Sequence, residues 1–406
     1  MRDTALPLFR QSMHSDYWKK KTMPRISLHC GLFKSCLPSG ERDTPAPAAG
    51  GSPPAPGSSS KCLDAARFIG MPASRRRREG VGPQDAPPPR SAVAGPSNHS
   101  GPIGRGRTAL LLRQPVADTD LRLAYDTEPP QPPGTMAFFR HSGQAAELPP
   151  GFDTRGLESL QLSGSERITS AEQVRAIRQA YGDGPVVVVD LRQESHAVAD
   201  GHSLTWRGTN DWGNVGLDTA ATMAREAGQL EELRRQGNAV AVHAEYVKGK
   251  MDDPAPRHLA TTLACSEQEI VETAGAEYRR IAVTDHMRPS RTEVDQFIEL
   301  VRDLPEGTGL HVHCNGGRGR TTTFMVLYDM LRNAREVGAD AIMARQSKLG
   351  MDYNLADPGT AKKRKQLFHA DRLAFLHEFH AYARENPGGL PRTWSQWRSA
   401  DAAQSS

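Results

Sequence analysis

Apolar and polar positions after about residue 150 alternate between strand-like runs and helix-like spacing. Short runs of branched and apolar residues have the length of buried strands, at 185–190, 239–244, 278–284 and 309–313. Apolar spacing favours helices at 169–181, 217–236, 266–274, 290–304, 320–333, 339–349 and 362–384. Capping boxes that pair Thr169 with Glu172, Ser266 with Glu269, and Ser290 with Glu293 mark three helix starts. Strands that alternate with helices predict an α/β fold with a central, mostly parallel sheet covered by helices on both sides.

The first third of the chain differs from the rest in composition. Residues 1–150 hold 22 of the 30 prolines and carry 20 basic against 12 acidic side chains, whereas residues 151–406 carry 31 against 35. Stretches such as 44–60 lack aromatic residues and any period, so they cannot bury enough apolar surface to offset the entropy of ordering. We therefore expect disordered segments at 1–147 and 399–406, and one domain at 148–398.

Several protein classes are excluded by the same survey. No apolar run reaches the roughly 18 residues of a membrane-spanning helix, and residues 1–21 lack the apolar core of a Sec signal peptide. Five scattered cysteines are too few for a disulfide framework, which indicates a reducing compartment where a thiol can be reactive. The net charge of +4 comes from the basic first third, which we interpret as a delivery segment and not as a nucleic-acid site.

The segment at 313–321, His-Cys-Asn-Gly-Gly-Arg-Gly-Arg-Thr, joins a predicted strand to a predicted helix. A glycine-rich turn at a helix N-terminus points backbone N–H groups into one concavity, and the helix dipole adds to its attraction for anions. The segment can wrap closely around an anion because Gly316, Gly317 and Gly319 have no Cβ atoms that would clash. The sequence therefore predicts a phosphate site; the alternative is an ordinary glycine turn after a buried structural cysteine.

Four side chains of this segment suit phosphoryl transfer. The field of the loop favours the thiolate of Cys314, which can attack a bound phosphate. Arg320, six residues later, can bind two phosphate oxygens. Thr321 can donate its hydroxyl to the thiolate or to the leaving phosphate, and His313 can fix the loop by hydrogen bonding to the backbone. This chemistry needs no metal or other cofactor, and we expect none.

Asp285 is the candidate general acid. It follows the predicted strand at 278–284 and precedes a short loop that Pro289 closes, so its carboxyl group can swing over a phosphate site. It would protonate the leaving oxygen and then deprotonate the water that hydrolyses phosphocysteine. The alternative is a turn or capping aspartate.

Further segments carry a family resemblance. They are Val-Asp-Leu-Arg-Gln-Glu-Ser-His at 189–196, Thr-Asn-Asp-Trp-Gly-Asn-Val-Gly at 209–216, the stretches 278–297 and 311–331, and Thr-Trp-Ser-Gln-Trp at 393–397. With them, the chain resembles the cysteine phosphatases and, more narrowly, the protein-tyrosine-phosphatase-like inositol phosphatases, the cysteine phytases of bacteria. The resemblance covers about residues 148–398. The segments 189–196 and 209–216 are the more specific ones, because tyrosine phosphatases generally lack them.

The resemblance implies a role for each of five residues. Cys314 would be the nucleophile, Arg320 the phosphate clamp and Asp285 the acid. His286 and Asp211 would lie near the substrate, although a core hydrogen bond for His286 and a turn position for Asp211 are the alternatives.

The late helix and the 189–196 segment add four charged residues. The resemblance places Lys365 and Arg372 against peripheral phosphates, and the alternative is a merely solvated helix face. We interpret Arg192 and Glu194 as a scaffold ion pair behind the loop.

The sequence departs from the family in its charged positions. Asn315, Gly316, Gly317 and Arg318 stand where the family often has Glu-Ala-Gly-Val, so an acidic residue is lost and a cation is gained near the substrate. The segment Lys-Gly-Lys at 248–250 replaces Gly-Lys-His-Lys, so Lys248 or Lys250 would substitute for a missing binding histidine. The family's Phe-Arg near the domain start is Phe-Asp-Thr-Arg at 152–155, and we assign its arginine to neither position.

The resulting hypothesis is a phosphomonoesterase that hydrolyses myo-inositol hexakisphosphate stepwise through phosphocysteine. A protein tyrosine phosphatase and a pseudophosphatase that binds phospho-ligands without turnover are the alternatives. The expected partners are an inositol polyphosphate and, for residues 1–147, a secretion chaperone. A long Ser/Pro/Arg-rich N-terminus resembles that of type III secretion effectors of plant-associated bacteria, which implies delivery into host cells; the alternative is a cytoplasmic protein with a flexible extension.

Overall fold

A computed structural model describes residues 117, 119–126, 134–182, 184–208, 210–250, 252, 255–357 and 363–404, with the backbone alone at 363, 364 and 401–404. All of them belong to one compact unit, Ile69–Ser406. Most of the segment that the sequence predicts to be disordered, 1–147, lies outside the described residues.

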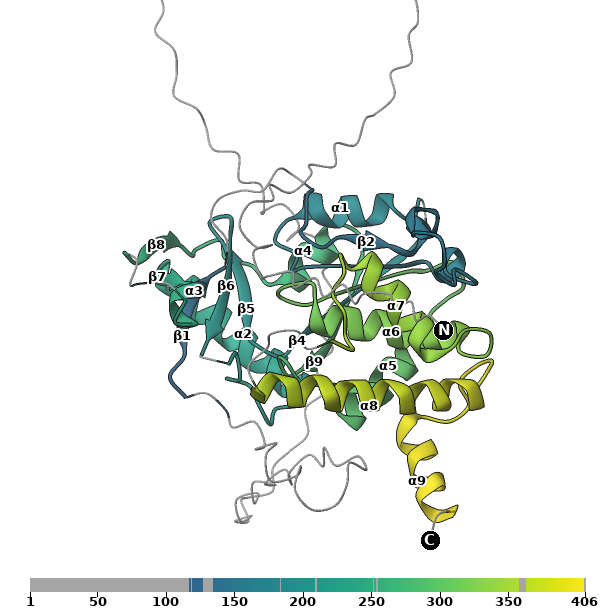
Figure 1. The fold of residues 1–406 in the computed structure, drawn as a ribbon. Coiled ribbons are helices and arrows are strands. Elements are labelled where there is room, and N and C mark those ends of the chain that lie inside the picture. Colours follow the sequence, from purple (N-terminus) through teal and green to yellow (C-terminus); the bar gives the residue numbers. More distant parts are fainter. Residues whose placement is uncertain are drawn as a thin grey trace, which may run out of the picture. The chain divides into compact units, whose positions relative to one another are not determined.

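From β6 to α6 the elements of this unit alternate between strands and helices, and three further helices follow (Figure 1). In chain order they are β1 (Arg122–Tyr125), β2 (Arg140–His141), η1 (Ser142–Glu147), η2 (Glu158–Leu160), β3 (Leu162–Ser165), α1 (Ala171–Gln179), β4 (Val186–Arg192), β5 (His196–Ala199), β6 (His202–Arg207), α2 (Thr219–Gln236), β7 (Asn238–His243), α3 (Ala244–Val247), β8 (Arg257–Ala260), α4 (Glu267–Thr273), β9 (Glu277–Val283), α5 (Arg291–Asp303), β10 (Gly309–His313), α6 (Gly319–Asn333), α7 (Ala339–Leu349), α8 (Lys363–Glu385) and α9 (Trp394–Gln404).

One five-stranded sheet has the order β2-β3-β10-β4-β9. Strand β10 pairs in parallel with β3 and β4, β4 pairs in parallel with β9, and only β2 is antiparallel. The predicted mostly parallel sheet is therefore confirmed. Because the parallel strands point the same way, the loops that follow β3, β4, β9 and β10 meet at one edge of the sheet.

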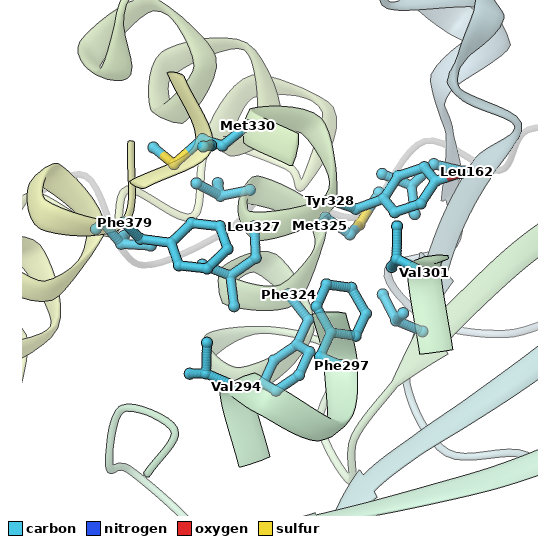
Figure 2. Close-up of a cluster of buried hydrophobic side chains, with 14 of the residues drawn as sticks. Leu162, Val294, Phe297, Val301, Phe324, Met325, Leu327, Tyr328, Met330 and Phe379 are labelled. Carbon is cyan, nitrogen blue, oxygen red and sulfur yellow. The ribbon is translucent and has the colours of Figure 1, made fainter. Parts of the chain in front are cut away.

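Helices cover both faces of this sheet, as the sequence predicts. Along β4, Val187 and Val189 belong to the core formed with α5, α6 and α8, whereas Val186 and Val188 belong to the core formed with α1 and α4. Alternation of this kind follows from the period of two along a strand. Figure 2 shows the first core, in which Phe297 of α5 meets Phe324 of α6 edge to face with ring centroids 4.9 Å apart.

A second five-stranded sheet, in the order β5-β6-β1-β7-β8, was not anticipated from the sequence. It is mostly antiparallel, and only the β1–β7 pair is parallel. The predicted strand at 239–244 belongs here and not to the central sheet. Strands β5 and β6 of the same sheet contain histidine, serine, threonine and arginine at buried positions, so no apolar run marks them.

The predicted helices are present with boundaries that differ by at most two residues. The capping boxes at Ser266 and Ser290 are confirmed, with Glu269 and Glu293 as their partners. The first box is shifted by one residue: the cap of α1 is Ser170, and its partner is Gln173.

Ordered structure extends beyond both ends of the predicted domain at 148–398. Strand β1, β2 and η1 precede residue 148, and α9 continues to Gln404. The four residues of β1 are too few to show a period in sequence, and they are held by pairing with β6 and β7. In the described part of the chain, no helix combines the length and apolarity that crossing a membrane requires.

Candidate active site

The loop at 314–319 leaves the central strand β10 and enters α6. All five residues of β10 are buried, and Cys314, which follows it, is 4% exposed. Gly317 has a φ of +66°, and a Cβ there would lie 2.6 Å from the backbone nitrogen of Glu166. This glycine is therefore required both by the backbone conformation and by the close approach of the chain after β3.

The thiol of Cys314 lies in a field that favours its ionised form. Burial raises its pKa, but the guanidinium of Arg320 and the hydroxyl of Thr321 lower it more, and the net pKa is below the ordinary value. The Thr321 hydroxyl donates a hydrogen bond to Sγ over 3.2 Å. The structure thus brings together three of the four side chains that the sequence singles out in this segment.

Arg320 is held by a carboxylate that the sequence analysis placed in the scaffold. Its Nη1 and Nη2 donate to the two oxygens of Glu194 at 2.7 and 2.8 Å, and both side chains are at most 3% exposed. Glu194 also pairs with Arg192 at 3.2 Å, which confirms the ion pair behind the loop. Nε of Arg320 is buried and has no hydrogen-bond acceptor among the described residues, so this donor is available to a ligand.

Asp285 lies beside Arg320 at the carboxyl end of β9. Its Oδ1 is 3.2 Å from Nη2 of Arg320, its Oδ2 is 3.2 Å from Nε2 of His286, and Trp212 donates to its backbone carbonyl over 3.1 Å. Burial alone would raise the pKa of Asp285, but Arg320 and then His286 and Arg207 lower it to about 2. Without a ligand this carboxyl group is therefore ionised at neutral pH.

His286 and Arg372 form the next layer around Asp285. His286 has a φ of +67° and a side chain that is 38% exposed, and its backbone carbonyl accepts a hydrogen bond from Nη2 of Arg372 over 2.8 Å. Arg372 is 2% exposed, and its Nε and Nη1 are buried without an acceptor in the described part of the chain. It is thus a buried cation and not a solvated helix face. Lys365 is exposed on the same helix and contributes to lowering the pKa of His286, after the larger effect of burial.

Asp211 is a turn residue with a φ of +59° that is also an ion-pair partner. Its Oδ2 accepts from Nη1 of Arg207 over 2.7 Å, while its buried Oδ1 has no partner among the described side chains. Burial raises its pKa, Arg207 opposes this, and Asp285 and Glu194 add to the rise, so the pKa reaches about 7. Unlike Asp285, this carboxyl group is largely protonated below neutral pH.

Lys248 and Lys250 do not reach the loop in this structure. Both ammonium groups pair with Glu245 of α3, at 2.7 and 2.9 Å. The sequence could not anticipate this, because the carboxylate that takes both lysines lies in a four-residue helix with no apolar pattern of its own.

His313 also differs from its expected contact. Instead of a hydrogen bond to the backbone, its Nε2 lies 2.6 Å from a carboxylate oxygen of Glu267, and both side chains are at most 1% exposed. Glu267 is the first residue of α4 and is 46 positions away in the chain, so no local motif pairs the two.

Arg318 and Asn315 meet two residues that sequence reasoning did not single out. The guanidinium of Arg318 lies 4.3 Å from the ring centroid of Phe138, a cation–π contact at the rim of the loop. The backbone carbonyl of Asn315 accepts from Nη1 of Arg167 over 3.0 Å. Arg140, which is 1% exposed, donates to the carbonyl of Gly317 over 2.6 Å.

Topology explains how these residues converge. Arg167, Glu194, Asp285 and Cys314 follow the parallel strands β3, β4, β9 and β10, so they share the edge of the sheet where ligands of parallel sheets bind. Strand β3, Leu-Ser-Gly-Ser, lacks an apolar run, so the sequence did not predict it. Arg167, which follows this strand, was missed for the same reason.

Known proteins share both the motifs and the fold of this chain. The family model for PTP-like phytases, described by the term inositol hexakisphosphate, matches residues 189–332. A solved PTP-like phytase from Bdellovibrio bacteriovorus is 33% identical with a TM-score of 0.56, and the match covers 70% of this chain and 97% of that one. The chain belongs to the PTP-like phytase family. Its two sheets and flanking helices accordingly have the PTP-like phytase fold.

Two further relatives extend the comparison. The PTP-like myo-inositol phosphatase from Mitsuokella multacida, solved in complex with myo-inositol-(1,3,4,5)-tetrakisphosphate, is 29% identical with a TM-score of 0.61, over 70% of this chain and 50% of that one. The effector protein hopD2 of Pseudomonas syringae pv. tomato is 45% identical over 305 residues, which are 74% of this chain and 65% of hopD2. The chain thus spans about half to two thirds of these two relatives.

Proposed function

We propose that this PTP-like phytase family member is a cysteine-dependent phosphomonoesterase that removes phosphates from myo-inositol hexakisphosphate one at a time. The observation that carries the proposal is the meeting of three groups: the Cys314 thiol with its Thr321 donor, the Arg320 guanidinium, and the Asp285 carboxyl group within 3.2 Å of that guanidinium. A nucleophile, an anion clamp and a proton donor are the parts that phosphoryl transfer through a covalent intermediate needs.

The first half of the reaction transfers a phosphoryl group to sulfur. The thiolate of Cys314 attacks phosphorus, the S–P bond forms, and the bond from phosphorus to the ring oxygen breaks. Nε of Arg320 and the backbone N–H groups of the loop bind the non-bridging oxygens, where negative charge is concentrated in the transition state.

Asp285 must be protonated to serve as the acid in this step. In the ligand-free protein it is ionised because Arg320 attracts its charge. A bound phosphate dianion replaces Asp285 as the ion-pair partner of Arg320 and places negative charge beside the carboxylate. Both effects raise the pKa of Asp285. The proton then passes to the leaving ring oxygen, so that a neutral hydroxyl group departs.

The second half of the reaction restores the thiolate. The Asp285 carboxylate takes a proton from water, the resulting hydroxide attacks phosphorus, and the S–P bond breaks to release inorganic phosphate. The hydroxyl of Thr321 stabilises the departing thiolate through the hydrogen bond that it already makes to Sγ. No step requires a metal ion.

Cations around the loop favour a ligand with several phosphates. Arg318, Lys365 and the free nitrogens of Arg372 surround the loop and the turn at His286, and they would bind the phosphates that are not being cleaved. Asp211 adds little repulsion below neutral pH because its carboxyl group is largely protonated there. A neutral carboxyl group can also donate a hydrogen bond to a phosphate oxygen.

A comparison of substrates tests this proposal. We expect the full chain to release phosphate from phytate in the presence of EDTA, and we expect Cys314→Ser to abolish release while Cys265→Ser, at the other described cysteine, retains it. Much faster release from a phosphotyrosyl peptide than from phytate would replace the proposal with a tyrosine phosphatase. Binding of phytate without release from either substrate would indicate a pseudophosphatase.

We further propose that the protein acts inside host cells and that residues 1–147 carry its delivery signal, with a secretion chaperone as their partner. The support is the 45% identity to the effector protein hopD2 and the proline-rich, basic composition of this segment. Residues 1–100 fused to a translocation reporter should carry it into host cells, and the reporter alone should not. Equal signals from the two proteins would contradict the proposal.

A further inference from the structure

A row of buried charges crosses the central sheet behind Cys314. In register, Asp190 of β4 is opposite Arg280 of β9 on one side and opposite His313 of β10 on the other. Nη1 of Arg280 lies 3.0 Å from Oδ2 of Asp190, and all three side chains are fully buried. The residue immediately before the nucleophile thus ends a row of charged side chains that no solvent screens.

Glu267 enters this row from α4. It is 1% exposed, and one carboxylate oxygen lies 2.6 Å from Nε2 of His313. One oxygen of Glu267, one oxygen of Asp190 and a ring nitrogen of His313 all lie within 4.8 Å of one another. Two carboxyl groups therefore face one imidazole from two different elements.

The carboxylate of Glu267 depends on His313 for its neutralisation. In the described part of the chain, its ion-pair partners are His313 at 2.6 Å and His196 at 3.6 Å, and neither oxygen accepts a conventional hydrogen bond. His196 is nearer to Asp190, at 3.3 Å, and to Glu226, at 3.2 Å. Since an unpaired buried carboxylate costs several kcal/mol, a proton on the imidazole of His313 is the neutralising charge that this arrangement calls for.

The other charged neighbours of His313 act in opposite directions. Asp190 on β4 and the thiolate of Cys314 favour the imidazolium, while Arg280 on β9 opposes it. His196 on β5 lies 3.3 Å from the same Asp190, and the ring centroid of His311 is 6.0 Å from that of His313. Burial holds the pKa of His311 well below its ordinary value, so this ring adds no positive charge. Burial lowers the pKa of His313, but Glu267, then Asp190 and Cys314, raise it above the ordinary value.

We propose that Glu267 is a positioning residue that holds His313 as an imidazolium, whose charge stabilises the thiolate of Cys314. The attraction is mutual, because the charge that favours the imidazolium also favours the thiolate. This inference rests on the proposed role of Cys314 as the nucleophile. Helix α4 contributes no residue to the phosphate loop. Through Glu267 it would nevertheless control the ionisation of the nucleophile.

The sign of the effect separates this role from a merely structural one. A negative charge at Glu267 acts directly on Cys314 by repelling the thiolate, so removing that charge alone would lower the pKa of the thiol. If Glu267 acts through His313, its removal lets the imidazole lose its proton, and the pKa of the thiol rises instead.

Alkylation of Cys314 provides the measurement. The rate of iodoacetamide modification of the Cys314 peptide, followed by mass spectrometry across pH in the full chain, gives the midpoint of thiolate formation. We expect Glu267→Gln to raise this midpoint by about one pH unit or more. Glu272→Gln, an exposed position on the same helix segment, should leave it unchanged. An unchanged or lowered midpoint in Glu267→Gln would overturn the inference.

Alkylation needs no substrate and no turnover, so its result is independent of the proposed phytase activity. An unshifted midpoint with intact phosphate release would remove only the role of Glu267, whereas a shifted midpoint without release from phytate would remove only the proposed substrate. If Glu267→Gln does not fold, NMR of the unmodified chain tests the inference through the imidazole ¹⁵N chemical shifts of His313. These signals are assigned by their absence from the spectrum of His313→Asn. A charged ring at pH 6.5 supports the inference, and a neutral ring contradicts it.

Discussion

The carboxylate of Asp285 contacts Arg320 and His286, and its proposed role as the acid requires that the contact with Arg320 be lost. Its ion pair with Arg320 keeps it ionised, whereas its proposed task needs a proton. Asp285→Asn keeps the shape and removes the acid. We expect the rate of phosphocysteine formation from phytate to fall by about 10²–10⁴-fold, the usual contribution of a positioned acid.

The leaving group provides the control for this prediction. p-Nitrophenolate departs without a proton, so phosphocysteine formation from p-nitrophenyl phosphate should fall far less in Asp285→Asn. Rapid-quench measurements of the first turnover compare the two substrates before hydrolysis of the intermediate interferes. An equal loss on both substrates would show that Asp285 acts on binding or loop geometry and not as the acid.

Asp211 gives the protein a pH dependence of stability. Its pKa is about 7 in the folded chain and about 4 in an unfolded one, so the folded state binds the extra proton between these values. Stability from this group is therefore present at low pH and declines as the pH rises toward 7. Asp211→Asn lacks this decline, and urea unfolding should show it gaining about 1–3 kcal/mol on the unmodified chain between pH 5 and pH 8. A constant difference between the two proteins across that range would contradict the prediction.

Sequence reasoning singled out the proposed reacting groups but not the side chains that support them. Cys314, Arg320 and Asp285 were found because the spacing of the loop and the ends of predicted strands constrain them. Glu194 was assigned to the scaffold, and its bidentate pairing with Arg320 was missed because a buried ion pair leaves no pattern in either segment. The site residues near the reacting groups therefore follow from local motifs, and their long-range partners do not.

At the scale of elements, the phosphate loop contains adjacent glycines with different requirements. Gly317 has a φ of +66°, and a Cβ there would lie 2.6–2.9 Å from backbone atoms of Ser165 and Glu166. A Cβ at Gly316 would have no atom within 4 Å. We expect Gly317→Ala to lower kcat/KM by about 100-fold or more, because a shift of the loop by about 1 Å misaligns the nucleophile.

Gly316→Ala is the matched control and should retain activity within a few-fold. Steady-state phosphate release from the two variants is the comparison, with thermal unfolding to confirm that both fold. Similar losses in both variants would indicate that the loop needs flexibility, and not the particular conformation at residue 317.

Element prediction succeeded where the signals are local and failed where pairing decides. Capping at Ser266 and Ser290 located two helix starts, since the motif itself makes the hydrogen bonds. Strands β5 and β6 were not predicted because their buried polar side chains bind distant partners, such as Asp126 for the guanidinium of Arg207 on β6. The second sheet could not be derived from periodicity, which reports burial in apolar surroundings only.

At the scale of the whole domain, Arg280 joins parts that belong to both sheets. It pairs with Asp190 of the central sheet and Glu226 of α2, and it donates to the carbonyl of Glu194 in the turn that leads to the second sheet. Removing one partner of such a buried network leaves unpaired charge. We expect Arg280→Gln to lower the free energy of unfolding by about 3–5 kcal/mol in urea titrations.

The neighbouring residue supplies the control. Arg279 is 57% exposed and pairs at the surface with Glu277, so Arg279→Gln should change the free energy of unfolding by no more than about 0.5 kcal/mol. Comparable losses in the two variants would show that strand β9 responds to any substitution, and not to loss of the buried network.

The contact between Asp285 and Arg320 also means that an anion must compete with the Asp285 carboxylate in order to bind Arg320. The tethered carboxylate is an anion that is always present at the site, at an effective concentration that a free ion in the cell does not match. Chloride, which can make only a single contact with the guanidinium, would not displace it. A phosphate that engages Arg320 and the loop amides together can do so, and discrimination between anions thus begins before any bond is broken.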